Sequence, residues 1–152
     1  MKEARKFIWR QARKFRRKYP FTIAFRLWAH SKIIAKHLNP GEKIKYVFGA
    51  QKGPSSADIV STYIIVITDK RIMIGRKRLV FGYFFLAITP ELFNDIKVKK
   101  GLLWAKVEID TVKEYIILSN IQGGAASKIE TAITQYVMKK KCPPKKNGEK
   151  AS

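Results

Sequence analysis

The chain has 152 residues, of which 46% are hydrophobic, and this size and composition suit one globular domain with a core of its own. Its formal charge of +21 is concentrated at the ends, with +11 in residues 1–38 and +5 in residues 139–152. Basic ends on a milder body indicate a polyanionic partner, either a lipid surface or a nucleic acid. A basic surface that serves solubility alone is the alternative.

Cysteine content and hydropathy bear on the compartment. A single cysteine, Cys142, excludes an intramolecular disulfide, so nothing points to an oxidising environment. The longest uncharged apolar stretch, residues 79–90, is too short to span a bilayer as a helix. We expect a cytoplasmic protein, peripheral at the inner membrane surface if lipid is its partner. The Arg-rich N-terminus also resembles a mitochondrial presequence, which leaves that destination open.

Residues 2–19 are predicted to form an amphipathic helix. Its apolar stripe recurs at steps of three and four residues, at Ala4, Ile8, Ala12, Phe15 and Tyr19. A basic stripe flanked by aromatic residues lies opposite, a pattern typical of helices that lie flat in a membrane interface. Packing of the apolar stripe on the domain or on a partner is the alternative. The predicted membrane-binding residues are Lys6, Phe7, Trp9, Arg10, Arg13, Lys14, Arg16 and Arg17.

A second helix is predicted over residues 21–38, after Pro20. It is apolar over a broad arc but carries three basic residues, so it does not read as a membrane span. So much apolar surface requires a cover. We expect it to dock on its own domain; a protein partner, a second copy of the chain or lipid are the alternatives. Residues 39–41, Asn-Pro-Gly, end this helix.

The centre of the chain predicts an antiparallel sheet. Eight of the ten residues from 59 to 68 are β-branched, and turn-compatible residues at 69–71 separate this run from 72–74, which predicts a hairpin. Arg76, Lys77 and Arg78 then form a basic turn that could bind an anion. The seven strands are predicted at about 43–51, 58–68, 72–74, 80–88, 95–99, 103–110 and 113–119.

An amphipathic helix follows the glycine pair at 123–124 and ends in three lysines. The fold class we predict is therefore mainly β: a seven-stranded antiparallel curved sheet or barrel, capped by a C-terminal helix and preceded by two N-terminal helices. We expect a basic helical extension at 1–38, the domain at 39–141 and a disordered basic tail at 142–152.

Two short motifs stand at residues 38–44, L-N-P-G-E-K-I, and at residues 68–72, T-D-K-R-I. They resemble the L-x-x-G-E-x-I that opens the bacterial pleckstrin-homology-like (PH-like) domains, the YokE-like group in particular, and the T-D-K-R-[LI] hairpin of the same domains. The resemblance covers residues 38–138. It implies a seven-stranded curved sheet capped by one helix, and it implies little about biochemical role. Eukaryotic PH domains commonly grip phosphoinositides with basic residues near the first two strands, but here the loop at 52–57 offers only Lys52.

No constellation for catalysis emerges from the sequence. His30 and His37 lie seven residues apart on one predicted helix, too far to chelate a metal together, and glycine-rich phosphate loops are absent. We expect no enzyme activity, no metal and no cofactor. The predicted function is non-catalytic binding or scaffolding at the cytoplasmic face of an anionic membrane. The alternative is a nucleic-acid-binding accessory protein that uses the same basic ends.

Overall fold

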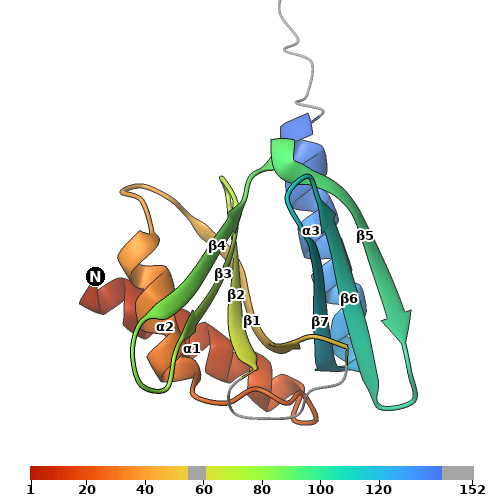
Figure 1. The fold of residues 1–152 in the computed structure, drawn as a ribbon, viewed down its shortest axis with the longest axis horizontal. Coiled ribbons are helices and arrows are strands. Elements are labelled where there is room, and N and C mark those ends of the chain that lie inside the picture. The colour runs from red at the N-terminus through yellow and green to blue at the C-terminus, as the bar shows by residue number, and fades with distance from the viewer. Residues whose placement is uncertain (55–60, 142–152) are drawn as a thin grey trace, which may run out of the picture.

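The structure, a computed structural model, describes residues 1–54 and 61–141. Seven antiparallel strands form one sheet in the order β4-β3-β2-β1-β7-β6-β5, curled into a half-barrel (Figure 1). The predicted fold class is confirmed. The strands are β1 (Ile44–Lys52), β2 (Thr62–Thr68), β3 (Ile72–Lys77), β4 (Tyr83–Ile88), β5 (Phe93–Lys100), β6 (Trp104–Thr111) and β7 (Tyr115–Gln122). The helices are α1 (Lys2–Lys18), α2 (Leu27–His37), the short 3-10 helix η1 (Pro90–Leu92) and α3 (Gly123–Lys141).

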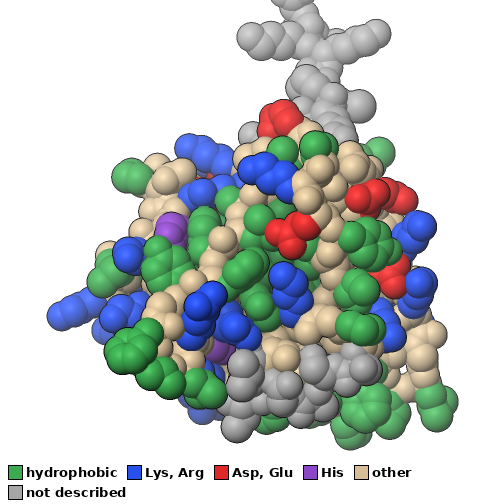
Figure 2. All heavy atoms as spheres, viewed as in Figure 1, with side chains coloured by type: hydrophobic (Ala, Val, Ile, Leu, Met, Phe, Trp, Pro, Cys, Tyr) green, Lys and Arg blue, Asp and Glu red, His purple; other side chains and the backbone are tan. Residues whose placement is uncertain are grey.

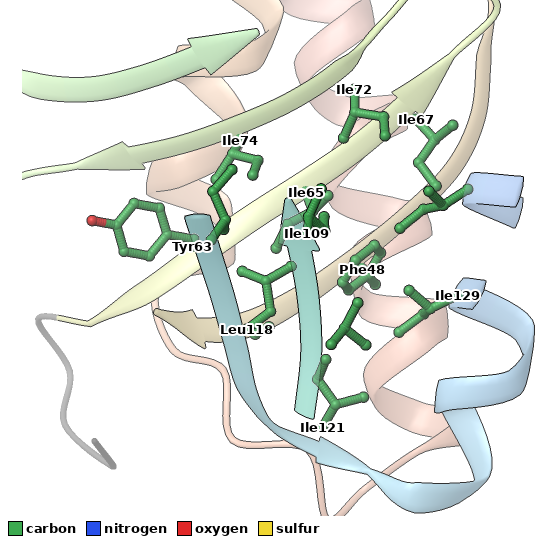
Figure 3. Close-up of a cluster of buried hydrophobic side chains, with 14 of the residues drawn as sticks. Phe48, Tyr63, Ile65, Ile67, Ile72, Ile74, Ile109, Leu118, Ile121 and Ile129 are labelled. Carbon is green, nitrogen blue, oxygen red and sulfur yellow. The ribbon is translucent and has the colours of Figure 1, made fainter. Parts of the chain in front are cut away.

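The inner face of the curled sheet holds the larger hydrophobic core. Side chains from both halves of the sheet meet α3 there: Phe48 of β1 and Leu118 of β7 share one cluster with Ile129 of α3 (Figure 3). β1 pairs with β7 only through Gln51 and Lys52, so the two halves of the sheet diverge away from that point. The helix α3 fills the inner side and joins the two halves through apolar contacts.

The outer face of the same sheet is covered by α1 and α2. Ile8 of α1 and Ile34 of α2 are fully buried in a second cluster, which includes Ile64 and Val66 of β2. Neighbouring residues of a strand point to opposite faces, and Ile65 accordingly belongs to the inner core. Every residue of β2 is buried, because both of its faces are packed. This is why the run in β2 is continuously apolar and does not alternate with polar residues.

The apolar stripe of the first helix therefore packs on its own domain. Ile8 and Ala12 are fully buried and Phe15 is 5% exposed. Phe15 also contacts the inner core, with its ring centroid 6.0 Å from that of Phe48. The stripe is thus not free to enter a bilayer, and residues 1–38 supply part of the protein's own core.

The second helix and the segment before it also pack closely on the sheet. A Cβ atom added at Gly49 of β1 would lie 2.8 Å from the Cβ of Ala24, so the glycine lets the segment before α2 approach the sheet backbone. The expectation that residues 21–38 dock on their own domain is confirmed, although Phe21 and Trp28 remain 57% and 44% exposed.

Several boundaries predicted from the sequence are wrong, and two of them bear on the candidate surface. The second helix begins at Leu27, because residues 21–26 bond to other elements: the Ile23 amide donates to Asn120 O (2.9 Å) and the Phe25 amide donates to Thr62 Oγ1 (3.1 Å). Arg26 follows in the left-handed conformation, with φ of 53°.

The predicted basic turn is also shifted. Arg76 and Lys77 belong to β3, where they pair with Phe84 and Tyr83 of β4, so the turn runs from residue 78 to residue 82. The first residues of the predicted strand 58–68, together with Cys142 and the predicted tail 142–152, lie outside the described residues.

Candidate anion-binding surface

Basic side chains of α1 gather beside the start of α2. Trp9 and Trp28 make an edge-to-face contact, with ring centroids 5.3 Å apart. The guanidinium of Arg5 stacks over Trp28 at 3.9 Å from the ring centroid and donates from Nη2 to the Trp28 carbonyl oxygen (3.1 Å). These contacts join α1 to α2 and border a hollow of about 470 Å³. The hollow is lined by Trp9, Arg13, Arg16, Arg17, Pro20, Arg26, Leu27 and Trp28.

A second hollow, of about 260 Å³, lies under the β3–β4 turn. Arg26 lines both hollows, so they adjoin. The second hollow is lined by Arg26, Arg76, Lys77, Arg78, Leu79, Val80 and Phe81. We use "the basic surface" for the seven cationic residues of the two hollows: Arg13, Arg16, Arg17, Arg26, Arg76, Lys77 and Arg78.

Acidic partners are scarce around the basic surface among residues 1–54 and 61–141. The ion pairs between side chains of these residues do not involve Arg13, Arg16, Arg17, Arg26, Lys77 or Arg78. The Arg76 guanidinium lies over the Tyr63 ring, 5.2 Å from its centroid. Cations from three separate elements therefore face one region, which raises its positive potential and favours a polyanion.

Three apolar side chains stand out from the β3–β4 turn beside these cations. Leu79, Val80 and Phe81 are 56%, 77% and 85% exposed. At the lower left of Figure 2, a hydrophobic group protrudes next to Lys and Arg side chains, where Figure 1 places this turn. We call these three residues the hairpin tip.

The eight residues that the sequence predicts as membrane-binding do not share one site. Trp9, Arg13, Arg16 and Arg17 border the first hollow, whereas the residues of the predicted anion-binding turn, Arg76, Lys77 and Arg78, border the second. Lys6 and Arg10 are exposed but line neither hollow. The remaining two, Phe7 and Lys14, border a different hollow beside β1.

Beside this hollow, a groove of about 740 Å³ lies between α3 and β1. Lys45, Tyr46 and Lys128 line both. A side-chain hydrogen bond with Lys18, together with repulsion from its positive charge, lowers the pKa of Lys128 below its usual range. This groove also carries lysines, from β1 and α3, but the hairpin tip does not line it.

The two motifs that resemble PH-like domains form a structural network and not a ligand site. Arg71 donates to Glu42 through Nε (3.0 Å to Oε1) and Nη2 (3.0 Å to Oε2), and Thr68 Oγ1 donates to Glu42 Oε1 (2.6 Å). Burial raises the pKa of Glu42, but hydrogen bonds from Arg71, Thr68 and the Asn39 amide outweigh burial and hold the pKa below its ordinary value. The network ties the start of β1 to the β2–β3 hairpin.

His30 and His37 also have structural surroundings. His30 is fully buried, and its Nδ1 accepts a hydrogen bond from the Lys77 amide (3.0 Å). Burial, with the nearby charges of Arg26 and Arg76, lowers the pKa of His30 to about 4. His37 stacks on Phe85, with ring centroids 4.0 Å apart. Each ring thus packs between α2 and the β3–β4 hairpin.

No group of three or more His, Cys, Asp or Glu side chains in residues 1–54 and 61–141 is arranged to hold a metal ion. No helix within the described part of the chain is long and apolar enough to cross a membrane.

Comparison with known proteins gives the family. The bacterial PH domain family matches residues 38–135, and the chain belongs to this family. A search of curated proteins finds no match. Among solved structures, the chain is similar to a DUF1696 family protein with a pleckstrin-homology domain from Shewanella loihica PV-4, with 13% identity and a TM-score of 0.50. The likeness covers 70% of this chain and 89% of that one, and it supports the fold.

The resemblance identified from the sequence is therefore confirmed. PH domains are generally non-catalytic binding modules, and this chain has their fold. Residues 1–37, which include all of α1 and α2, precede the family match. The family match begins at residue 38, but one hydrophobic cluster contains residues from both sides of this position, such as Ile34 and Ile64.

Sequence reasoning misses Arg26 of the basic surface and the three residues of the hairpin tip. The sequence predicts Arg26 inside a helix and Val80 and Phe81 at the start of an apolar strand, and it gives Leu79 no role. Gly82 was the available signal: with φ of 76° it ends the turn after Phe81, and a glycine within an apolar run often marks such a bend. Nothing local in the sequence indicates that Arg26 adjoins the turn.

Proposed function

We propose that the protein is a non-catalytic PH-like binding or scaffolding module that attaches to the anionic surface of a membrane through its basic surface, at the cytoplasmic face. The observation that carries this proposal is the convergence of cations from α1, the start of α2 and the β3–β4 hairpin on two adjoining hollows. Each Lys or Arg near an anionic leaflet contributes about 1 kcal/mol. Several engaged together give useful affinity without a specific headgroup pocket.

Lipid is favoured over nucleic acid by the side chains beside the cations. Proteins that bind single-stranded nucleic acid without sequence preference place aromatic rings where bases can stack. Here Trp28 is already occupied by Arg5 and Trp9, and two residues of the hairpin tip, Leu79 and Val80, are aliphatic. Exposed aliphatic residues next to cations suit a bilayer interface, where apolar and anionic groups lie side by side.

Point substitutions test this proposal better than deletion. Removing residues 1–38 would uncover the outer face of the sheet, where Ile64, Val66 and Met73 are fully buried. A truncated chain that precipitates or binds vesicles through that face would tell nothing about α1.

The experiment is co-sedimentation with vesicles of phosphatidylcholine, with and without phosphatidylglycerol. We expect the wild type to bind the anionic vesicles, and the R13Q/R16Q/R17Q variant to bind at least about tenfold more weakly, since about 1 kcal/mol is lost for each charge engaged. The matched control, K97Q/K106Q/K113Q, removes the same charge from the β5–β7 side of the sheet and should retain binding.

Equal weakening by both triple variants would contradict a localised surface and leave only non-specific attraction. Gel-shift assays with DNA and RNA are run beside the vesicles. Retention of nucleic acid without vesicle binding would favour the alternative, a nucleic-acid-binding accessory protein.

A further inference from the structure

We propose that the hairpin tip, Leu79, Val80 and Phe81, inserts into the apolar layer of the bilayer while the surrounding basic residues contact the lipid headgroups. This inference rests on the proposed function and adds to it the element that enters the membrane. Its starting point is exposure: three consecutive apolar side chains, each more than half exposed, stand at the end of one hairpin.

The hairpin holds the tip firmly. β3 and β4 remain paired up to Lys77 and Tyr83, and beyond them the Arg78 amide donates to Gly82 O (3.1 Å). Gly82, with φ of 76°, closes the turn. The three apolar residues therefore project as a short loop on a paired β-ribbon, so their exposure is a built feature of the turn and not that of a loose chain end.

The surroundings of the tip match the two layers of a membrane surface. Arg76, Lys77 and Arg78 lie immediately before the tip on the same hairpin, and Arg26 lines the hollow beneath it. A tip that enters the acyl region would bring these cations to the depth of the lipid phosphates. The arginines of α1 adjoin through Arg26, so both parts can face one bilayer.

The tip also supplies what α1 cannot. A basic helix at an interface usually inserts its apolar stripe, but here Ile8, Ala12 and Phe15 are buried in the protein. Attachment by charge alone is weakened by salt, because exposed charges are screened within about 10 Å at 0.1 M ionic strength. Apolar insertion by the tip would retain binding under those conditions.

A second copy of the chain is a poor occupant for this surface. The protein carries a formal charge of +21, and joining two tips would bring two basic surfaces together. An anionic bilayer offers both the negative charge and the apolar interior, whereas a self-contact offers only the second.

The test compares two variants, each of which removes exposed apolar side chains from a different turn. L79S/V80S/F81S leaves every charge in place. The control is Leu102→Ser, since Leu102 is fully exposed in the turn between β5 and β6. With phosphatidylglycerol-containing vesicles, we expect the tip variant to bind at least about tenfold more weakly than wild type at raised salt, because the transfer of its apolar side chains is lost, and the control to bind like wild type.

Insertion is measured directly with an environment-sensitive fluorophore on a single cysteine, at Phe81→Cys or at Leu102→Cys, each in a Cys142→Ser background. Vesicles should shift the emission of the probe at position 81 to the blue, and lipids brominated in the acyl chain should quench it. The probe at position 102 should stay in water.

Vesicle binding with a probe at position 81 that remains in water would overturn the insertion and leave the proposed function standing. Failure of the wild type to bind any vesicle would overturn both. A blue shift without vesicles that grows with protein concentration, together with a larger mass by light scattering that the tip variant loses, would show a protein contact in place of the bilayer.

Discussion

The two hairpins that share β3 treat their charges in opposite ways. In the β2–β3 hairpin, Arg71 pairs with Glu42 and the Asp69 carboxylate accepts the Lys43 amide (2.8 Å), so these two charges are satisfied within the fold. In the β3–β4 hairpin, Lys77 and Arg78 make no ion pair with any carboxylate of the described residues, and the tip beyond them is apolar and exposed. The first hairpin completes the domain, whereas the second carries part of the surface that we propose binds a membrane.

This comparison separates the family motif from the binding surface. The residues by which the chain resembles PH-like domains build the satisfied hairpin, which explains why the resemblance informs the fold more than the function. The basic surface draws on residues that precede the matched region and on a turn within it.

The largest loss of stability is expected from removing the carboxylate that pairs with Arg71 of the β2–β3 hairpin. Glu42→Ala leaves the Arg71 guanidinium, whose side chain is 17% exposed, without its carboxylate. Removing one partner of a buried pair costs about 3–5 kcal/mol, so the free energy of unfolding in urea should fall by that order. Lys77→Ala, in the other hairpin, should change it by less than about 0.5 kcal/mol. Similar losses in both variants would contradict the contrast.

A smaller, pH-dependent effect on stability is expected from His30, which packs against the β3–β4 hairpin. His30 stays neutral in the folded protein, with its pKa lowered from 6.5 to about 4, while the unfolded chain takes up a proton near pH 6.5. The unfolded state therefore binds more protons between these values, and stability falls as the pH drops from 7 toward 4. The full loss is about 3 kcal/mol, at 1.36 kcal/mol for each unit of pKa.

Urea unfolding at several pH values measures this dependence. His30→Asn, whose side-chain carbonyl can still accept the Lys77 amide, should have a shallower slope between pH 6.5 and 4, whatever its absolute stability. An unchanged slope in His30→Asn would place the pH dependence elsewhere.

The smallest effect is expected at the turn itself. Gly82→Ala forces an alanine into φ of 76°, and the added Cβ meets nothing nearer than the Arg78 side chain at 4.0 Å. Only backbone strain is added, which should lower the free energy of unfolding by about 1–2 kcal/mol. Gly82→Asn should cost less, since asparagine tolerates this conformation better. A larger loss than in Glu42→Ala would reverse the contrast between the hairpins.

The sequence predicts the fold well and the candidate surface only in part. The helical period places α1, alternation places strands such as β5 and β6, and a run of β-branched residues places β2. The period cannot tell what covers an apolar stripe: Ile8 and Phe15 suit a bilayer and a sheet equally well. The surface depends on Arg26 lying beside residues 76–81, a contact between positions about fifty apart that no local pattern encodes.

The central claim is that the basic surface and the hairpin tip face one bilayer. The most direct measurement is the accessibility of nitroxide spin labels to a water-soluble relaxation agent, with and without phosphatidylglycerol-containing vesicles. The labels are placed one at a time at Arg17→Cys, Phe81→Cys, Leu102→Cys and Val112→Cys in the Cys142→Ser background. We expect positions 17 and 81 to lose accessibility to the agent on binding and positions 102 and 112 to keep it. Protection of positions 102 and 112, with 17 and 81 left accessible, would contradict the account.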